Sequence, residues 1–67
     1  MADATFRKVE LVGTSSESLS AAINNAIAKA AESVGDMKWF EVVELRGRIS
    51  KGKVDQYQVT IRVGVTM

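Results

Sequence analysis

The stretch that most constrains how this chain folds is KWFEVVELR, which contains the only tryptophan. Successive side chains of a strand point to opposite faces, so a half-buried strand alternates apolar and polar residues. Here Phe40 and Val42 point one way while Trp39, Val43 and Leu45 point the other, unless a bulge shifts the phase midway. Apolar side chains then lie on both faces. We expect other copies of the chain to cover the second face, and Trp39 to lie where a flat group can stack.

The small size of the chain favours self-association. The 67 residues form one domain, residues 1–67, and contain no Cys and no His. A domain of this size buries only roughly 60% of the surface that its unfolded chain exposes, and small scaffolds usually add disulfides, a metal or oligomerisation. Without Cys the chain cannot form a disulfide, and without Cys and His it lacks the usual ligands of zinc, so no metal site is expected. Oligomerisation is therefore the expected source of additional stability.

Charge and hydropathy exclude several classes of protein. Nine Lys and Arg residues against eight Asp and Glu residues give a net charge of +1, far from the basic balance of a general nucleic-acid binder. The apolar runs are shorter than the ~20 residues of a membrane span. The amino-terminal residues lack the features of a secretory signal. We expect a soluble cytoplasmic protein without nucleic-acid or membrane partners.

A strand and a helix are predicted in the first half. Residues 5–12 alternate as a strand that closes at Gly13. The pattern Thr14-x-x-Glu17 fits a capping box, with Ser15 or Ser16 as alternative caps. Residues 16–34 then follow a helical period that Gly35 ends. The apolar stripe of this helix consists of Leu19, Ile23, Ala26, Ile27, Ala30 and Val34.

Two further strands are predicted in the second half. The first covers residues 37–49, and its length and Gly47 suggest a bend or bulge within it. The second covers residues 54–66. Residues 50–53 read as a hairpin turn. The order β-α-β-β predicts an α+β fold, a three-stranded antiparallel sheet with one helix on a single face.

At this point the sequence resembles the dodecins, small flavin-binding proteins that assemble into hollow homododecamers. The matching residues, which together span nearly the whole chain, are Val9-Glu10-Leu11-Val12-Gly13-Thr14-Ser15, the Ala-rich helix, Trp39-Phe40-Glu41-Val42, Arg46-Gly47 and Tyr57-Gln58-Val59. The resemblance implies a sheet wrapped around the helix and subunits that meet at two-fold and three-fold contacts. It also implies flavins bound in pairs and stacked between tryptophans of neighbouring subunits.

The resemblance assigns roles to three residues. Trp39 would stack on the flavin ring, Gln58 would hydrogen-bond its polar edge, and Arg46 would meet the phosphate of FMN, as in bacterial members. Riboflavin or another flavin is the alternative ligand, and coenzyme A, reported for some bacterial members, is a possible further partner. Where bacterial relatives often carry another basic residue near the end of the last strand, this chain has Thr66.

Each role has an alternative in the residues themselves. Trp39 could be a ligand-free subunit contact, because tryptophan is enriched in interfaces generally. Gln58 could pair with a neighbouring polar side chain on a solvated face, and Gln56 lies on that same face. Arg46 could form an ion pair with Glu44 or Glu41, or with a neighbouring subunit.

The sequence does not predict an enzyme, because nucleophilic triads and metal-activated water lack their usual residues. The functional prediction is therefore a flavin-storage and photoprotection module, a homododecamer that sequesters FMN or riboflavin. Stacking on Trp39 would quench the excited flavin. The alternatives are a structural oligomer and, more remotely, a single-strand nucleic-acid platform.

Overall fold

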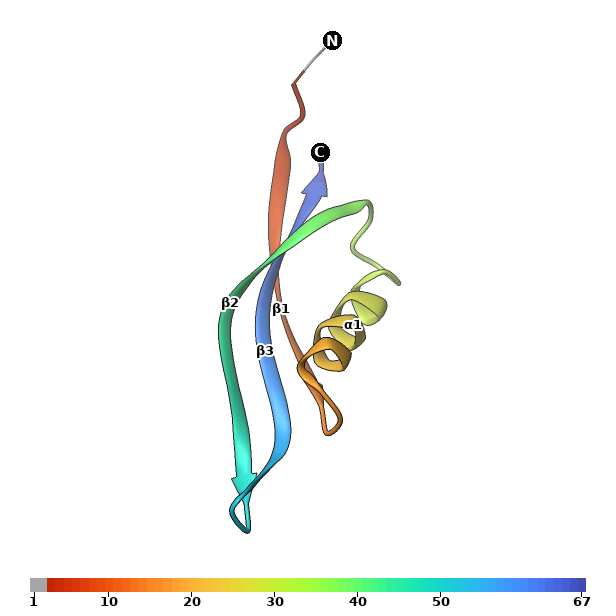
Figure 1. Ribbon diagram of the computed structural model, residues 1–67. Helices are drawn as coiled ribbons and strands as arrows, with labels where there is room; N and C mark the ends of the chain where they lie inside the picture. Colours follow the sequence, from red (N-terminus) through yellow and green to blue (C-terminus); the bar gives the residue numbers. More distant parts are fainter. Residues whose placement is uncertain (1–2) are drawn as a thin grey trace.

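The computed structural model describes residues 3–67 as one sheet and one helix (Figure 1). Strand β1 covers Phe6–Ser15, helix α1 covers Leu19–Ala30, strand β2 covers Met37–Ser50 and strand β3 covers Lys53–Thr66. The strands are antiparallel in the order β1-β3-β2, so the last strand is the central one. The predicted α+β class and β-α-β-β order are confirmed.

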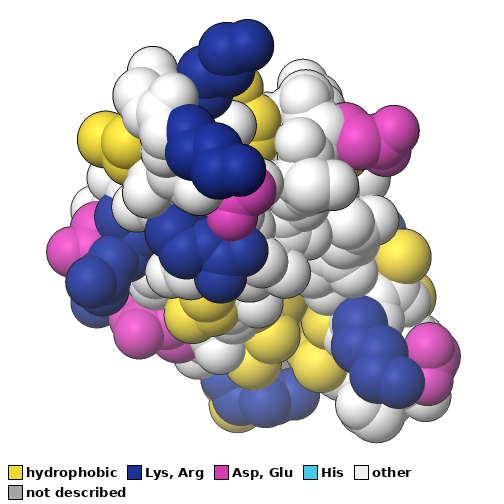
Figure 2. Space-filling view, turned by 90° about the horizontal axis from the view of Figure 1, so that it is seen from below, with side chains coloured by type: hydrophobic (Ala, Val, Ile, Leu, Met, Phe, Trp, Pro, Cys, Tyr) yellow, Lys and Arg dark blue, Asp and Glu magenta, His cyan; other side chains and the backbone are white. Residues whose placement is uncertain are grey.

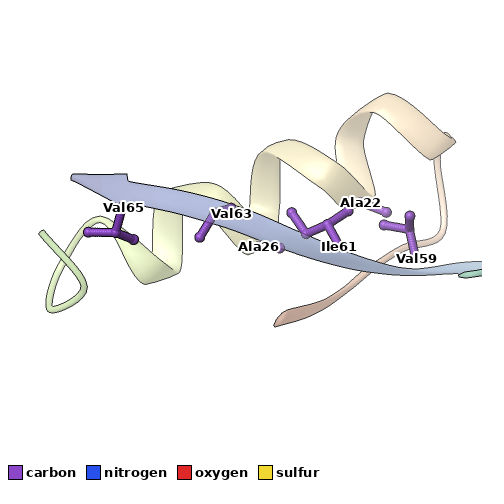
Figure 3. Close-up of a cluster of buried hydrophobic side chains, with 6 residues drawn as sticks. All are labelled: Ala22, Ala26, Val59, Ile61, Val63 and Val65. Atoms are coloured by element: carbon purple, nitrogen blue, oxygen red, sulfur yellow. The ribbon is translucent and has the colours of Figure 1, made fainter. Parts of the chain in front are cut away.

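The core lies between α1 and the β1–β3 half of the sheet. Val59, Ile61 and Val63 are at most 1% exposed and face the small residues of the helix (Figure 3). Alanine is enough on the helix side, because α1 approaches β1 very closely at Gly13. A Cβ atom at Gly13 would lie 2.8 Å from Ala26 Cβ and closer still to the backbone oxygen of Ala22. Gly13 is therefore needed for packing, although the sequence suggested only that it ended the strand.

The first strand is longer, and the helix shorter, than predicted. Thr14 and Ser15 remain in register with β3, so neither is available to cap the helix. The cap is Ser18, whose hydroxyl accepts a hydrogen bond of 3.0 Å from Ala21 N–H. The predicted capping box is therefore wrong. At the other end α1 stops at Ala30, and a turn leads to Gly35, which has the expected positive φ of 106°.

A bulge in β2 decides which side chains share a face. The register with β3 shifts between Val42 and Glu44, as the alternative reading of this stretch allowed. Residues directly opposite one another lie on the same face of a sheet, and Leu45 is opposite the buried Val59. Leu45 therefore lies on the helix side together with Phe40 and Val42. The expectation that it shares a face with Trp39 is wrong.

The hairpin between β2 and β3 projects beyond the helix and β1 (Figure 1). Its turn residues Lys51 and Gly52 both have positive φ, 54° and 76°, which is the geometry of a tight type I′ turn. The irregularity predicted for β2 is confirmed by register shifts at Val42/Glu44 and Arg48/Ile49, although Gly47 itself pairs regularly with Tyr57. A Cβ atom there would come within 2.6 Å of the backbone oxygen of Gln56.

Candidate functional site

The face of the sheet away from α1 carries the predicted site residues. One row across the strands consists of Lys8 on β1, Gly64 on β3 and Trp39 on β2. Because Gly64 has no side chain, the indole of Trp39 occupies the space above the central strand. Trp39 keeps 37% of its surface exposed, while Gly64 beneath it is buried. The row therefore presents an aromatic surface supported by backbone.

Two side chains of β1 border the indole. The ring of Phe6 meets that of Trp39 edge-on, with centroids 5.6 Å apart and an interplanar angle of 66°. The ammonium of Lys8 lies 5.9 Å from the indole centroid. This distance is at the outer limit of a cation–π contact. Strands far apart in the sequence thus combine to hold Trp39.

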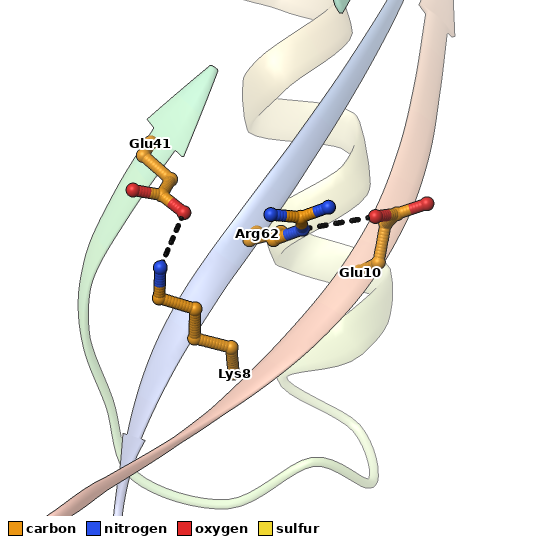
Figure 4. Close-up of polar contacts among 4 residues, drawn as sticks. All are labelled: Lys8, Glu10, Glu41 and Arg62. Atoms are coloured by element: carbon orange, nitrogen blue, oxygen red, sulfur yellow. Dashed lines mark hydrogen bonds and ion pairs between the residues drawn. The ribbon is translucent and has the colours of Figure 1, made fainter. Parts of the chain in front are cut away.

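Two ion pairs lie on the same face beside the row of Trp39, and Figure 4 shows the four side chains that form them. Lys8 Nζ donates to Glu41 Oε2 at 2.8 Å, and Arg62 Nε donates to Glu10 Oε1 at 3.0 Å. The hydrogen bond from Lys8 is the main cause that lowers the pKa of Glu41 below its ordinary 4.5, with the charges of Lys8 and Arg62 adding to the effect. The lowered pKa favours the ionised form of Glu41, which pairs with Lys8 beside the indole.

A second row on this face brings Arg46 and Gln58 together. They are opposite one another on β2 and β3. Arg46 lies 3.6 Å from Glu44 Oε1, and its side chain is 66% exposed. The amide of Gln58 donates a hydrogen bond of 3.0 Å to Gln56 Oε1. The chain therefore contains both polar contacts that the sequence left open as alternatives to ligand binding.

The structure does not bring Trp39 and Gln58 together within one chain. Gly64 and Gln58 are six positions apart on β3, and at ~3.3 Å per residue the rows of Trp39 and Gln58 are separated by roughly 20 Å. This is longer than the fused ring system of a flavin. This spacing favours a ring contacted by Trp39 and Gln58 of different copies of the chain over one contacted by both side chains of a single chain.

The helix side of β2 has no cover. Phe40, Val42 and Leu45 are 46%, 51% and 56% exposed, because α1 packs on β1 and β3. Ile23 and Ile27 of α1 line a groove beside Phe40. Figure 2, seen from the end with the β2–β3 turn, shows apolar atoms exposed between groups of basic and acidic side chains. An apolar surface of this kind is typical of an interface.

Comparison with known proteins identifies the family of this chain. A sequence model of the Dodecin family matches residues 5–67. The chain belongs to the dodecin family. A dodecin from Thermus thermophilus is 51% identical over 59 residues, which cover 88% of this chain and 86% of the relative. Members of this family are small flavin-binding proteins.

Solved structures show the same fold. A crystal structure of a Thermus thermophilus protein has a TM-score of 0.90 at 46% identity, covering 97% of this chain and 96% of the other. The dodecin from Streptomyces davaonensis has a TM-score of 0.89 at 39% identity, covering 98% and 97%. The Streptomyces coelicolor dodecin reaches 0.90 at 36% identity, covering 100% and 96%. Along residues 3–67, no helix combines the length and apolar character that crossing a membrane requires.

Sequence reasoning missed three residues around the indole, namely Gly64, Lys8 and Phe6. The signal for Gly64 was present, because a glycine inside an otherwise alternating strand often marks a close approach of another group. The contacts of Lys8 and Phe6 had no such signal. They depend on β1 pairing with β3 from the opposite end of the chain.

Proposed function

We propose that this dodecin binds FMN or a closely related flavin with the isoalloxazine ring stacked on Trp39. The observation that carries the proposal is the half-exposed indole supported by the backbone of β3. An oxidised flavin is flat and electron-poor, and indole is the most electron-rich aromatic side chain. An offset stack adds about 0.5–1.5 kcal/mol beyond the burial of area. Electron transfer from indole to the excited flavin would quench fluorescence and photochemistry, which suits storage and photoprotection.

The site is completed by self-assembly, which we propose to be a homododecamer. The roughly 20 Å between the rows of Trp39 and Gln58 supports a ring held between copies, with Trp39 and Gln58 supplied by different chains. The side-chain amide of Gln58 offers a donor and an acceptor to the pyrimidine edge of the ring. The uncovered apolar side of β2 supplies a surface on which copies can pack.

Arg46 is the proposed phosphate contact. Its guanidinium is exposed, and its contact with Glu44 is long at 3.6 Å, so a phosphate could replace it at little cost. A guanidinium can bind phosphate through two parallel hydrogen bonds. The presence of Thr66 in place of a second basic residue predicts weaker phosphate binding than in relatives that have one. Coenzyme A remains a proposed further partner without assigned residues.

The proposed role is binding without catalysis. Glu10 and Glu41, which lie in the row next to that of Trp39, are both held in ion pairs with basic side chains. A cytoplasmic location and the absence of nucleic-acid partners stay predictions from composition.

A structural oligomer is the second candidate, and one contact favours it. The amide of Gln58 is already bonded to Gln56, so a ligand would have to displace this hydrogen bond. In that case Trp39 would be a dry contact between subunits.

The deciding experiment purifies the protein with added FMN and measures size by gel filtration, together with flavin absorbance and emission. We expect a large assembly that carries flavin absorbance but little flavin fluorescence. A large colourless assembly would support the structural candidate. A colourless monomer would contradict both.

Replacing Trp39 by alanine tests the stack itself. We expect Trp39→Ala to weaken FMN binding at least tenfold and to restore flavin emission, because the stacking surface and the quencher are both lost. Titration of FMN into assemblies of matched size measures this. Unchanged affinity in Trp39→Ala would rule out the stack.

A further inference from the structure

Gly64 of the central strand lies directly under the indole. A Cβ atom at residue 64 would come within 2.6 Å of Trp39 Cδ2, and closer still to Cε2 and Cζ2. Cδ2 and Cε2 are the two carbons at which the indole rings are fused. Their being among the nearest atoms means that the indole turns its face, not its edge, toward the backbone of β3.

No ordinary side chain fits between the indole and β3. Real Cβ contacts essentially never fall below 3.0 Å, so something must shift if a methyl group is added. The backbone of β3 is held on both sides, by β1 and by β2. The indole is the part that can move, because its outer side is open to solvent.

From this geometry we infer that Gly64 is a positioning residue for the flavin stack, an inference that rests on the proposed function. Gly64 lets the indole lie against the sheet between Phe6 and Lys8, which sets the height and tilt of its outer face. A larger residue at position 64 would lift the indole into the space that the flavin ring is to occupy. The size of residue 64 therefore decides how close to the sheet the indole lies, and so how much space is left above it for the flavin ring.

The backbone of β3 offers no competing reason for this glycine. The structure assigns a positive φ to Gly35 and Gly52 but not to Gly64. Residue 64 pairs regularly with both Lys8 and Trp39 inside the strand. Glycine in a strand interior is otherwise unfavourable, since it has no side chain to pack. The space taken by the indole is what requires it.

The test compares Gly64→Ala with wild type and with Thr60→Ala, a control on the same face of β3 in the row of Glu44 and Val12. Trp39 is the only tryptophan, so its fluorescence reports the indole without ambiguity. In ligand-free protein, we expect Gly64→Ala to raise quenching of Trp39 by acrylamide and to change the near-ultraviolet circular dichroism. In titrations with FMN and riboflavin, we expect both dissociation constants to rise about tenfold in Gly64→Ala. Thr60→Ala should match wild type in both measurements.

A double-mutant cycle shows whether Gly64 acts through the indole. The three atoms nearest to a Cβ at residue 64 belong to the six-membered ring of the indole, and Trp39→Phe removes that second ring. The effect of Gly64→Ala on flavin binding should therefore fall to about twofold or less in a Trp39→Phe background.

Every other outcome also supports or overturns either the inference about Gly64 or the proposed flavin function. Wild-type quenching and affinity in Gly64→Ala would overturn the inference while leaving the proposed function intact. Failure of wild type to take up FMN or riboflavin would overturn the flavin function, whereas the quenching comparison would still decide the placement of Trp39. If Gly64→Ala does not assemble, recovery in Gly64→Ala/Trp39→Ala would support the steric argument, and no recovery would overturn it.

Discussion

The two halves of the sheet differ in how far one chain can complete them. On the helix side of β3, Val59, Ile61 and Val63 are almost fully buried under α1. On the helix side of β2, Phe40 and Val42 remain about half exposed. Both sets are apolar and directly paired across the strands. The difference lies in the cover that α1 gives to one half and not to the other.

The single helix is too narrow to cover three strands. Close packing at Gly13 draws α1 toward β1 and β3, which makes a dense core from alanine and valine. The same approach leaves β2 outside. The half of the sheet that α1 covers, β1 and β3, is closed and provides stability within the chain. The uncovered half, β2, is open and provides a surface for other copies. Each prediction below acts on one side of this contrast.

Gly13→Val should have the largest effect, because it breaks the closed half. Its Cβ would collide with the backbone of Ala22, so α1 must move away from the core. We expect a loss of about 3 kcal/mol or more, measured by urea unfolding at equal protein concentration. Thr14→Val, on the opposite face of the same strand, should change stability by less than about 0.5 kcal/mol. Equal effects of both variants would contradict the close-packing argument.

Val42→Asp should break the open half while leaving the closed half folded. A carboxylate would be buried without a partner in any contact that covers β2. Light scattering after gel filtration should show loss of the large assembly, while circular dichroism keeps the α+β spectrum. Val42→Thr has nearly the same shape and should assemble more completely. Full assembly of Val42→Asp would show that this surface is not an interface.

Arg46→Ala should have a smaller and selective effect on ligand binding. We expect FMN to bind about tenfold more weakly while riboflavin, which lacks the phosphate, is little changed. Isothermal titration of both ligands measures the difference. Arg48→Ala is the matched control, because Arg48 is held by Asp55 at 2.6 Å. Equal losses for FMN and riboflavin would exclude a phosphate contact at Arg46.

Lys8→Met should have the smallest effect, on the border of the indole. Removing the hydrogen bond from Lys8 should raise the pKa of Glu41 toward 4.5, as measured by NMR titration of the side-chain carboxyl carbon. The pKa of Glu41 is lower in the folded chain than in the unfolded chain. The ion pair therefore contributes its full stabilisation at pH values above the pKa of Glu41 in the unfolded chain, and this contribution is lost as the pH falls through the pKa of Glu41 in the folded chain. Both side chains are exposed, so the change in stability should be small and should shrink further in salt. An unchanged Glu41 titration would contradict this cause.

Much of the fold could be read from the residues. Alternation in residues 54–66, the helical period before Gly35 and the polar turn at 50–53 predicted the element order. The errors arose where long-range pairing overrode local pattern. Thr14 and Ser15 have good capping side chains, yet pairing with β3 holds them in a strand. The bulge after Val42 moved Leu45 to the other face, which alternation by itself could not locate.

The sequence by itself determined the elements of this protein, because periodicity is a local property, and its resemblance to the dodecins singled out Trp39, Gln58 and Arg46 as candidate residues. Only the tertiary structure decided how these residues relate in space. It separated Trp39 from Gln58 along β3, joined Arg46 to the row of Gln58, and set Gly64 beneath the indole. The physical reason is the register of the sheet. Which residues stand opposite one another depends on strands paired across the whole chain and on the extra residue between Val42 and Glu44 in β2.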